Sequence, residues 1–136
     1  MIFQYTWQQV ISGEKTETRR PVKAGEVAET DAQGQIVAVI HKGRTKYRVG
    51  QVLAVQPART ASAIARIRLL GIERRAVTDI TDAEAQAEGN ADRAGFLRLW
   101  EMAHGAGKLD MDTWALRFEL VETLPALDKL TPSGAD

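Results

Sequence analysis

The sequence predicts one α+β domain that is mostly β: a small, mainly antiparallel barrel with short helices packed at its ends. The first observation is that segments with a strand pattern outnumber helical ones, and that the connections between them are short. The second is size, since 136 residues, 44% of them hydrophobic, suit a single domain with its own core.

Composition excludes several classes of site. The chain has no cysteine and two histidines, His41 and His104, which lie far apart in the sequence. Disulfides and thiolate metal sites are therefore excluded, and we expect neither a metal nor a cofactor. No apolar run approaches the roughly 20 residues that cross a membrane, and the N-terminus lacks the features of a secretory signal. We expect a cytoplasmic protein without a membrane partner, most simply a monomer.

The first elements are a short strand at residues 2–4 and a short helix after it. Thr6 and Gln9 have the spacing of a capping box, and Gly13 suits a left-handed helix end. A strand at residues 16–20 follows, because Pro21 closes an extended pattern. Its alternation places Thr18 and Arg20 on one face and Arg19 on the other. In an ideal strand Lys15 and Thr18 would lie on opposite faces. The two can still cooperate if the backbone bends near Lys15.

The middle of the chain is polar and rich in turns. Strand patterns at residues 27–30 and 36–40 flank a turn and predict a hairpin. A row of cations with single-residue gaps comes next: Lys42, Arg44, Lys46 and Arg48. Such a row suits either a track for phosphates or an edge strand kept soluble by charge. Residues 52–55 are nearly all apolar, which predicts a central strand, and residues 63–72 predict a long one.

The last third contains two helices and a strand. Thr81 and Glu84 form a capping box that opens a helix ending at Glu88. Asn90 is expected to cap a second helix at residues 91–104. Residues 114–121 alternate as a final strand, and residues 123–136 are expected to form a flexible tail.

Charge is unevenly distributed along the chain. Residues 1–75 contain 13 Lys and Arg against 6 Asp and Glu, and residues 76–136 contain 5 against 12. This split predicts either a basic face for a polyanion or two halves whose charges pair across the fold. Arg19, Arg20, Lys46 and Arg59 are the candidate phosphate ligands.

Lys15, Thr18 and Glu88 are the candidate catalytic residues. A threonine hydroxyl becomes a nucleophile when a base removes its proton, and a glutamate at a helix C-terminus is made more basic by the helix dipole. Lys15 could stabilise a developing oxyanion, and the three together could hydrolyse an amide or an ester. The alternative is a salt bridge between Lys15 and Glu88 that fastens a helix to the sheet.

Several short motifs occur in an order that resembles one family. The run Gly13-x-Lys15-Thr16-x-Thr18-x-Arg20 resembles the signature of the ASCH domain, a PUA-like barrel family. The similarity continues through residues 47–51, 80–89, 96–100, 104–105 and 114–118. It implies an ASCH domain at residues 1–122, with an inserted hairpin at about residues 22–45, followed by the tail.

The resemblance carries expectations about function. The family looks related to RNA or to modified nucleosides, and some small bacterial members remove acetyl from N4-acetylcytidine with a lysine, a threonine and a glutamate that match Lys15, Thr18 and Glu88. It therefore implies a basic cleft that holds RNA or a modified nucleoside or nucleotide. The alternative is a metal-independent amidohydrolase or ribonuclease that uses the same residues. A third possibility is a module whose hairpin contacts a protein partner.

Overall fold

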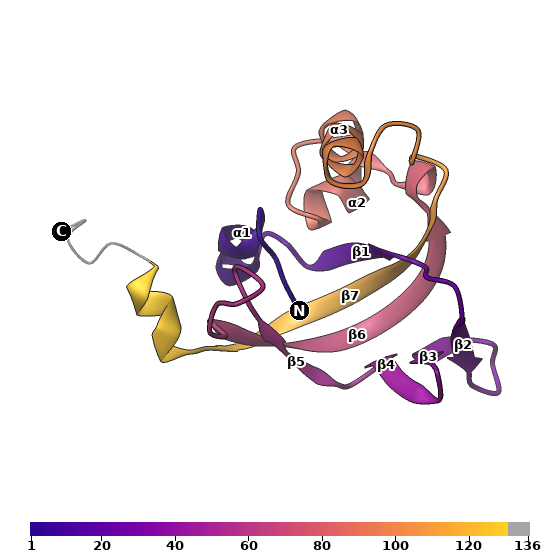
Figure 1. Cartoon of the computed structure of the whole chain (residues 1–136), viewed down its shortest axis with the longest axis horizontal. Helices are drawn as coiled ribbons and strands as arrows, with labels where there is room; N and C mark the ends of the chain where they lie inside the picture. The colour runs from indigo at the N-terminus through magenta and orange to yellow at the C-terminus, as the bar shows by residue number, and fades with distance from the viewer. Residues whose placement is uncertain (131–136) are drawn as a thin grey trace.

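The computed structural model describes residues 1–130, which form two antiparallel β-sheets and several short helices (Figure 1). The larger sheet has the strand order β1-β7-β6-β5, and the smaller has the order β2-β3-β4. The larger consists of β1 (Glu17–Pro21), β5 (Val52–Val55), β6 (Ala65–Ala76) and β7 (Asp112–Thr123). The smaller consists of β2 (Glu26–Thr30), β3 (Ile36–His41) and β4 (Arg44–Arg48).

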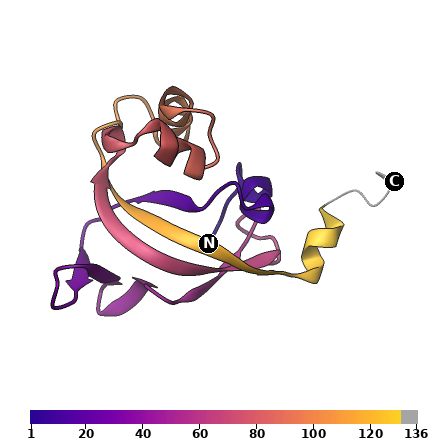
Figure 2. The same cartoon turned by 180° about the vertical axis from the view of Figure 1, so that it is seen from behind.

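Two long strands form the backbone of the larger sheet. β6 and β7 pair along their whole length and curve together, which is clearest from behind (Figure 2). The two strands match those predicted at residues 63–72 and 114–121, and Ile67 and Leu69 on β6 and Leu116 on β7 are fully buried. Val39 of the smaller sheet joins the same core, so the two sheets pack against each other. The predicted mostly β fold with short helices is confirmed.

The helices lie along one side of β1. α1 (Trp7–Ser12) leads into β1, the end of α2 (Asp82–Ala87) is hydrogen-bonded to the residue just before β1, and α3 (Arg93–His104) packs against α2 (Figure 1). α2, α3 and the 3-10 helix η1 (Val77–Asp79) share a small core of their own.

Of the four predicted helix caps, those at Gly13 and Thr81 are confirmed, and those at Thr6 and Asn90 are wrong. Gly13 adopts the left-handed conformation, with φ of 83°, and the capping box at Thr81 is complete. The Thr6 side chain makes no capping hydrogen bond. α3 is capped by Asp92, whose carboxylate accepts from the Gly95 amide at 2.8 Å, and not by Asn90. The backbone amide of Asn90 instead donates to the Ala85 carbonyl, and this bond continues the turn after α2.

Two further expectations need correction. β5 is an edge strand and not a central one: Val52 is 43% exposed, and beyond the end of β5 Gln56 makes a parallel bridge to Ile2. The chain after residue 123 does not begin as a loose tail, because Pro125–Lys129 form the 3-10 helix η2 and Leu127 packs against the core. Residues 131–136 of the expected tail lie outside the described residues.

The predicted hairpin is part of a complete three-stranded sheet. β2 and β3 pair as expected, and β4 extends the sheet from the other side of β3. The row of cations from Lys42 to Arg48 therefore does not run along one extended segment, because Lys42 and Gly43 form the turn between β3 and β4. In the described part of the chain, no helix is long and apolar enough to cross a membrane.

Candidate functional site

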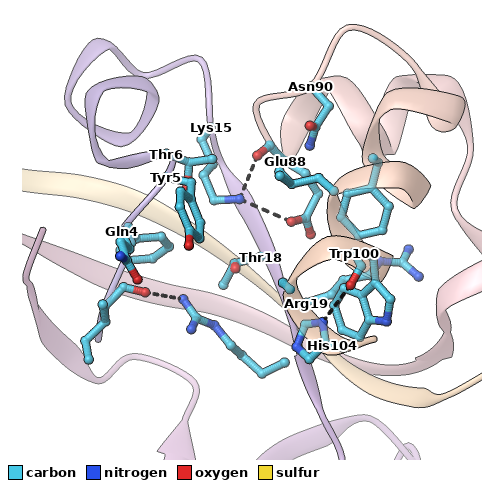
Figure 3. A pocket seen from close by; sticks show the side chains of 16 residues that line it. Gln4, Tyr5, Thr6, Lys15, Thr18, Arg19, Glu88, Asn90, Trp100 and His104 are labelled. Atoms are coloured by element: carbon cyan, nitrogen blue, oxygen red, sulfur yellow. Dashed lines mark hydrogen bonds and ion pairs between the residues drawn. The ribbon is translucent and has the colours of Figure 1, made fainter. Parts of the chain in front are cut away.

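A pocket of about 140 Å³ opens between the start of β1 and the helices α2 and α3 (Figure 3). All three candidate catalytic residues line it, although Glu88 is 73 residues away from Lys15 in the sequence. We call it the Lys15 pocket. Its wall also includes Tyr5 on one side and Trp100 and His104 on the other.

The backbone between α1 and β1 is held so that Lys15 faces this pocket. Gly13 ends α1, and the Lys15 amide then donates to the Gln9 carbonyl at 2.9 Å. The Thr16 amide donates to Ala87, the last residue of α2, at 2.7 Å. β1 begins after these bonds, at Glu17. Lys15 thus lies outside the regular strand, which removes the parity conflict with Thr18 that an ideal strand would impose.

Lys15 and Glu88 form a buried ion pair at the C-terminal end of α2. The lysine Nζ donates to the Glu88 backbone carbonyl at 2.6 Å and to its Oε1 at 3.1 Å. The exposed fractions are 5% for Lys15 and 3% for Glu88. Because the last carbonyls of a helix have no partner within it, the lysine ammonium serves both the backbone and the carboxylate.

Burial opposes charge on both members of this pair. It raises the pKa of Glu88 above its ordinary value, although Lys15 and the nearby arginines act in the opposite direction. It also lowers the pKa of Lys15, against the stabilising effect of Glu88. The second carboxylate oxygen, Glu88 Oε2, is buried and has no hydrogen-bond partner among residues 1–130. Glu88 Oε2 is therefore an unpartnered buried acceptor that is available to a ligand in the pocket.

Thr18 lies on β1 opposite Leu116 and is 5% exposed. Within the described part of the chain its hydroxyl makes no hydrogen bond to the protein. Figure 3 shows the side chain between the Tyr5 wall and the Trp100 wall, next to the Lys15–Glu88 pair. The Thr18 hydroxyl is therefore available to a molecule in the pocket.

Aromatic rings form one wall of the pocket. The His104 imidazole stacks on the Trp100 indole, with 3.9 Å between ring centroids, and its Nδ1 lies 3.2 Å from the Trp100 carbonyl oxygen. Tyr5, on the opposite side, is 68% exposed. Sequence reasoning missed this wall, although Trp100 and His104 have the i, i+4 spacing that places two side chains on one helix face.

The two arginines of the candidate set line the pocket, but both serve the fold. The Arg19 side chain is fully buried and donates to the Ala76 carbonyl at 3.0 Å and to Glu84 Oε2 at 3.2 Å. Arg20 donates to the Ile2 carbonyl at 2.9 Å and lies over the Phe3 ring. The two terminal nitrogens of Arg19 are therefore engaged, whereas Arg20 makes a single hydrogen bond, and the Nε of each arginine is buried without a hydrogen-bond partner among residues 1–130.

Lys46 and Arg59, the other candidate phosphate ligands, do not line the Lys15 pocket. Lys46 is on β4 and forms an ion pair with Glu26 of β2. Arg59 is exposed in the loop between β5 and β6. Across residues 1–130, no group of three or more acidic, histidine or cysteine side chains is arranged to hold a metal ion.

The fold and the pocket define a small β domain with a buried polar site, and solved structures show the same architecture. The ASCH domain from Lactobacillus crispatus matches over 85% of this chain and 69% of its own, with 16% identity and a TM-score of 0.56. Protein EF3133 from Enterococcus faecalis, described under the family name DUF984, matches over 87% and 71%, with 20% identity and a TM-score of 0.54. No family model and no curated protein matches the sequence. The chain therefore has the ASCH-domain fold, as the motifs of the sequence imply.

Proposed function

We propose that this protein binds a nucleoside, free or within RNA, with the base in the Lys15 pocket. The observation that carries the proposal is the convergence of the Lys15–Glu88 pair and the free Thr18 hydroxyl inside a pocket with aromatic walls. Such a combination of one stacking surface and a few buried polar groups is typical of sites for flat heterocycles.

The pocket offers complementary groups for a base. The exposed face of the Trp100–His104 stack and the ring of Tyr5 supply stacking surfaces, which contribute about 1–3 kcal/mol per base. Glu88 Oε2 is an acceptor suited to an exocyclic amine such as N4 of cytosine. Lys15 can donate to a base carbonyl. Within this pocket recognition would then depend on the base more than on phosphate, because Arg19 is already engaged by Ala76 and Glu84.

Calorimetric titration with cytidine and uridine tests this proposal. We expect Tyr5→Ala and His104→Ala each to weaken cytidine binding roughly tenfold, since each removes a stacking surface. Met102→Ala is the matched control, because Met102 is on α3 but 82% exposed and does not line the pocket. Absence of nucleoside binding, or equal weakening by the control, would contradict the proposal.

A second candidate function is removal of an acyl group from such a base, favoured by the free hydroxyl beside a buried pair with perturbed pKa values. The Thr18 hydroxyl would attack the acyl carbonyl carbon and pass its proton to the Glu88 carboxylate, while the Lys15 ammonium would stabilise the developing oxyanion. The C–N bond would break as the proton moves to the leaving amine. Water would then hydrolyse the acyl-threonine ester and restore the hydroxyl.

Incubation with N4-acetylcytidine, followed by chromatography for cytidine and acetate, tests the second function. Release of both products in equal amounts supports it. If the protein leaves N4-acetylcytidine intact but cleaves RNA in a parallel incubation, the same residues would belong to a ribonuclease. Binding of cytidine without either reaction would leave the binding function alone.

A further inference from the structure

A second hollow, of about 330 Å³, lies on the smaller sheet and shares no lining residue with the Lys15 pocket. It is built by β3, β4 and the segment that leads into β2, on the side of the fold where these strands are labelled (Figure 1). We call it the Lys23 hollow. Its lining contains one acid among residues that donate hydrogen bonds: Lys23, Glu26, His41, Arg44, Thr45 and Lys46.

The single acid of the hollow is already neutralised. Glu26 accepts from the Lys23 amide at 2.9 Å and from Trp114 Nε1 at 2.8 Å, and it forms an ion pair with Lys46. Burial alone would raise the pKa of Glu26, but these hydrogen bonds outweigh burial and leave the pKa lowered. The carboxylate therefore stays ionised, and Lys46 balances its charge.

Lys23 and Arg44 remain as uncompensated cations. Both are exposed, and neither forms an ion pair with any other residue in the range 1–130. This differs from the outer face of the larger sheet, where exposed arginines such as Arg66 and Arg68 each pair with a glutamate across the strands. Two free cations in one hollow, with the Thr45 hydroxyl beside them, favour an anion with several acceptor oxygens.

A third hollow shares lining residues with each of the two sites. Ile2 and Arg20 line both this third hollow and the Lys15 pocket. Lys46 lines both the third hollow and the Lys23 hollow. The three hollows are therefore neighbours, with Arg20 and Lys46 lying between the base site and the cations Lys23 and Arg44.

We propose that the Lys23 hollow binds phosphate groups, and that the ligand of the Lys15 pocket is therefore a nucleoside that carries phosphates. The second part rests on the proposed function. A nucleotide whose base lies in the Lys15 pocket would extend its phosphates along the third hollow towards Lys23 and Arg44. The shared chemistry is the phosphate, which either an RNA strand or a small phosphorylated ligand can supply.

The test compares a Lys23→Ala/Arg44→Ala variant with a Lys108→Ala/Lys129→Ala control. Each removes two exposed cations, but Lys108 and Lys129 lie outside all three hollows. Three probes are titrated into each protein over a range of salt concentrations: a fluorescent cytidine RNA octamer, cytidine and pyrophosphate. We expect the first variant to bind the octamer roughly tenfold more weakly and to lose about 0.7 in salt slope per phosphate contact, with cytidine binding unchanged.

The three probes separate the outcomes. Weaker octamer binding in the Lys23→Ala/Arg44→Ala variant supports an RNA strand as the source of phosphate, and weaker pyrophosphate binding alone supports a small phosphorylated ligand. The inference is overturned if the two variants weaken binding equally. It is also overturned if neither variant changes the binding of the octamer or of pyrophosphate. Failure of the nucleoside proposal is distinct, because the wild-type protein would then bind no cytidine.

Discussion

Lys15 donates from one ammonium group to both the backbone carbonyl and the carboxylate of Glu88, across 73 residues of sequence. This contact fastens the end of α2 to the segment before β1. It also places a buried ion pair at the edge of the pocket that Thr18 lines. The same pair therefore has a structural and a chemical consequence, and the two can be separated by experiment.

The structural consequence is tested by removing one or both charges. Lys15→Met leaves Glu88 buried without its cation, and we expect it to lower the free energy of unfolding by about 3 kcal/mol at pH 8. Lys15→Met/Glu88→Leu removes both charges and should be clearly more stable than Lys15→Met. Urea unfolding of Lys15→Met, of Glu88→Leu and of the double variant measures the coupling. Strict additivity of the single effects would contradict an energetic pairing.

The chemical consequence is tested at Thr18. If the protein is an amidohydrolase, Thr18→Val should slow cytidine release from N4-acetylcytidine at least about a thousandfold, because valine keeps the shape and lacks the nucleophile. Thr18→Ser should retain measurable activity. Cytidine binding by Thr18→Val, followed by calorimetry, is the control for an intact pocket. Undiminished release by Thr18→Val would exclude Thr18 as the nucleophile.

Glu17 gives the protein a pH dependence. Burial and the charge of Glu88 raise the pKa of Glu17 from 4.5 to about 7, although Arg19 opposes the shift. The folded state therefore binds a proton that the unfolded state releases between pH 4.5 and 7, so raising the pH through this window lowers the contribution of Glu17 to stability. Glu17→Gln should stabilise the protein at pH 8 and change little at pH 4. Urea midpoints of both proteins at the two pH values measure this, and an equal difference at both would refute it.

Arg19 is expected to act as a positioning residue. Its side chain connects β1 to the end of β6 and to α2, through Ala76 and Glu84. We expect Arg19→Met to destabilise the fold by about 2 kcal/mol, because it leaves the Ala76 carbonyl without its donor and removes one of the two arginines that pair with Glu84. Arg66→Met, at an exposed pair with Glu122, should change stability by less than about 1 kcal/mol. Equal effects of the two substitutions in thermal or urea unfolding would contradict this role.

Local patterns account for the parts of the fold that the sequence predicted. The alternation of Ile67, Leu69 and Leu116 revealed buried strand faces, and Gly13 and Thr81 marked helix ends, because each signal depends on a few adjacent residues. β5 was predicted to be a central strand but is an edge strand, because a short apolar run has the same sequence pattern in both positions. The cap at Asp92 was missed because Asn90 is an equally good capping residue two positions earlier.

The sequence by itself determined the fold class, the main strand faces and the identity of Lys15, Thr18 and Glu88 as candidates, because periodicity and motif spacing are properties of the linear chain. The tertiary structure decided that these three share a pocket with Trp100 and His104. It also decided that Arg19 and Lys46 form ion pairs while Lys23 and Arg44 form none among residues 1–130. The physical reason is that a charge is neutralised by whichever partner the fold brings within a few ångströms. For Arg19 that partner is 65 residues away.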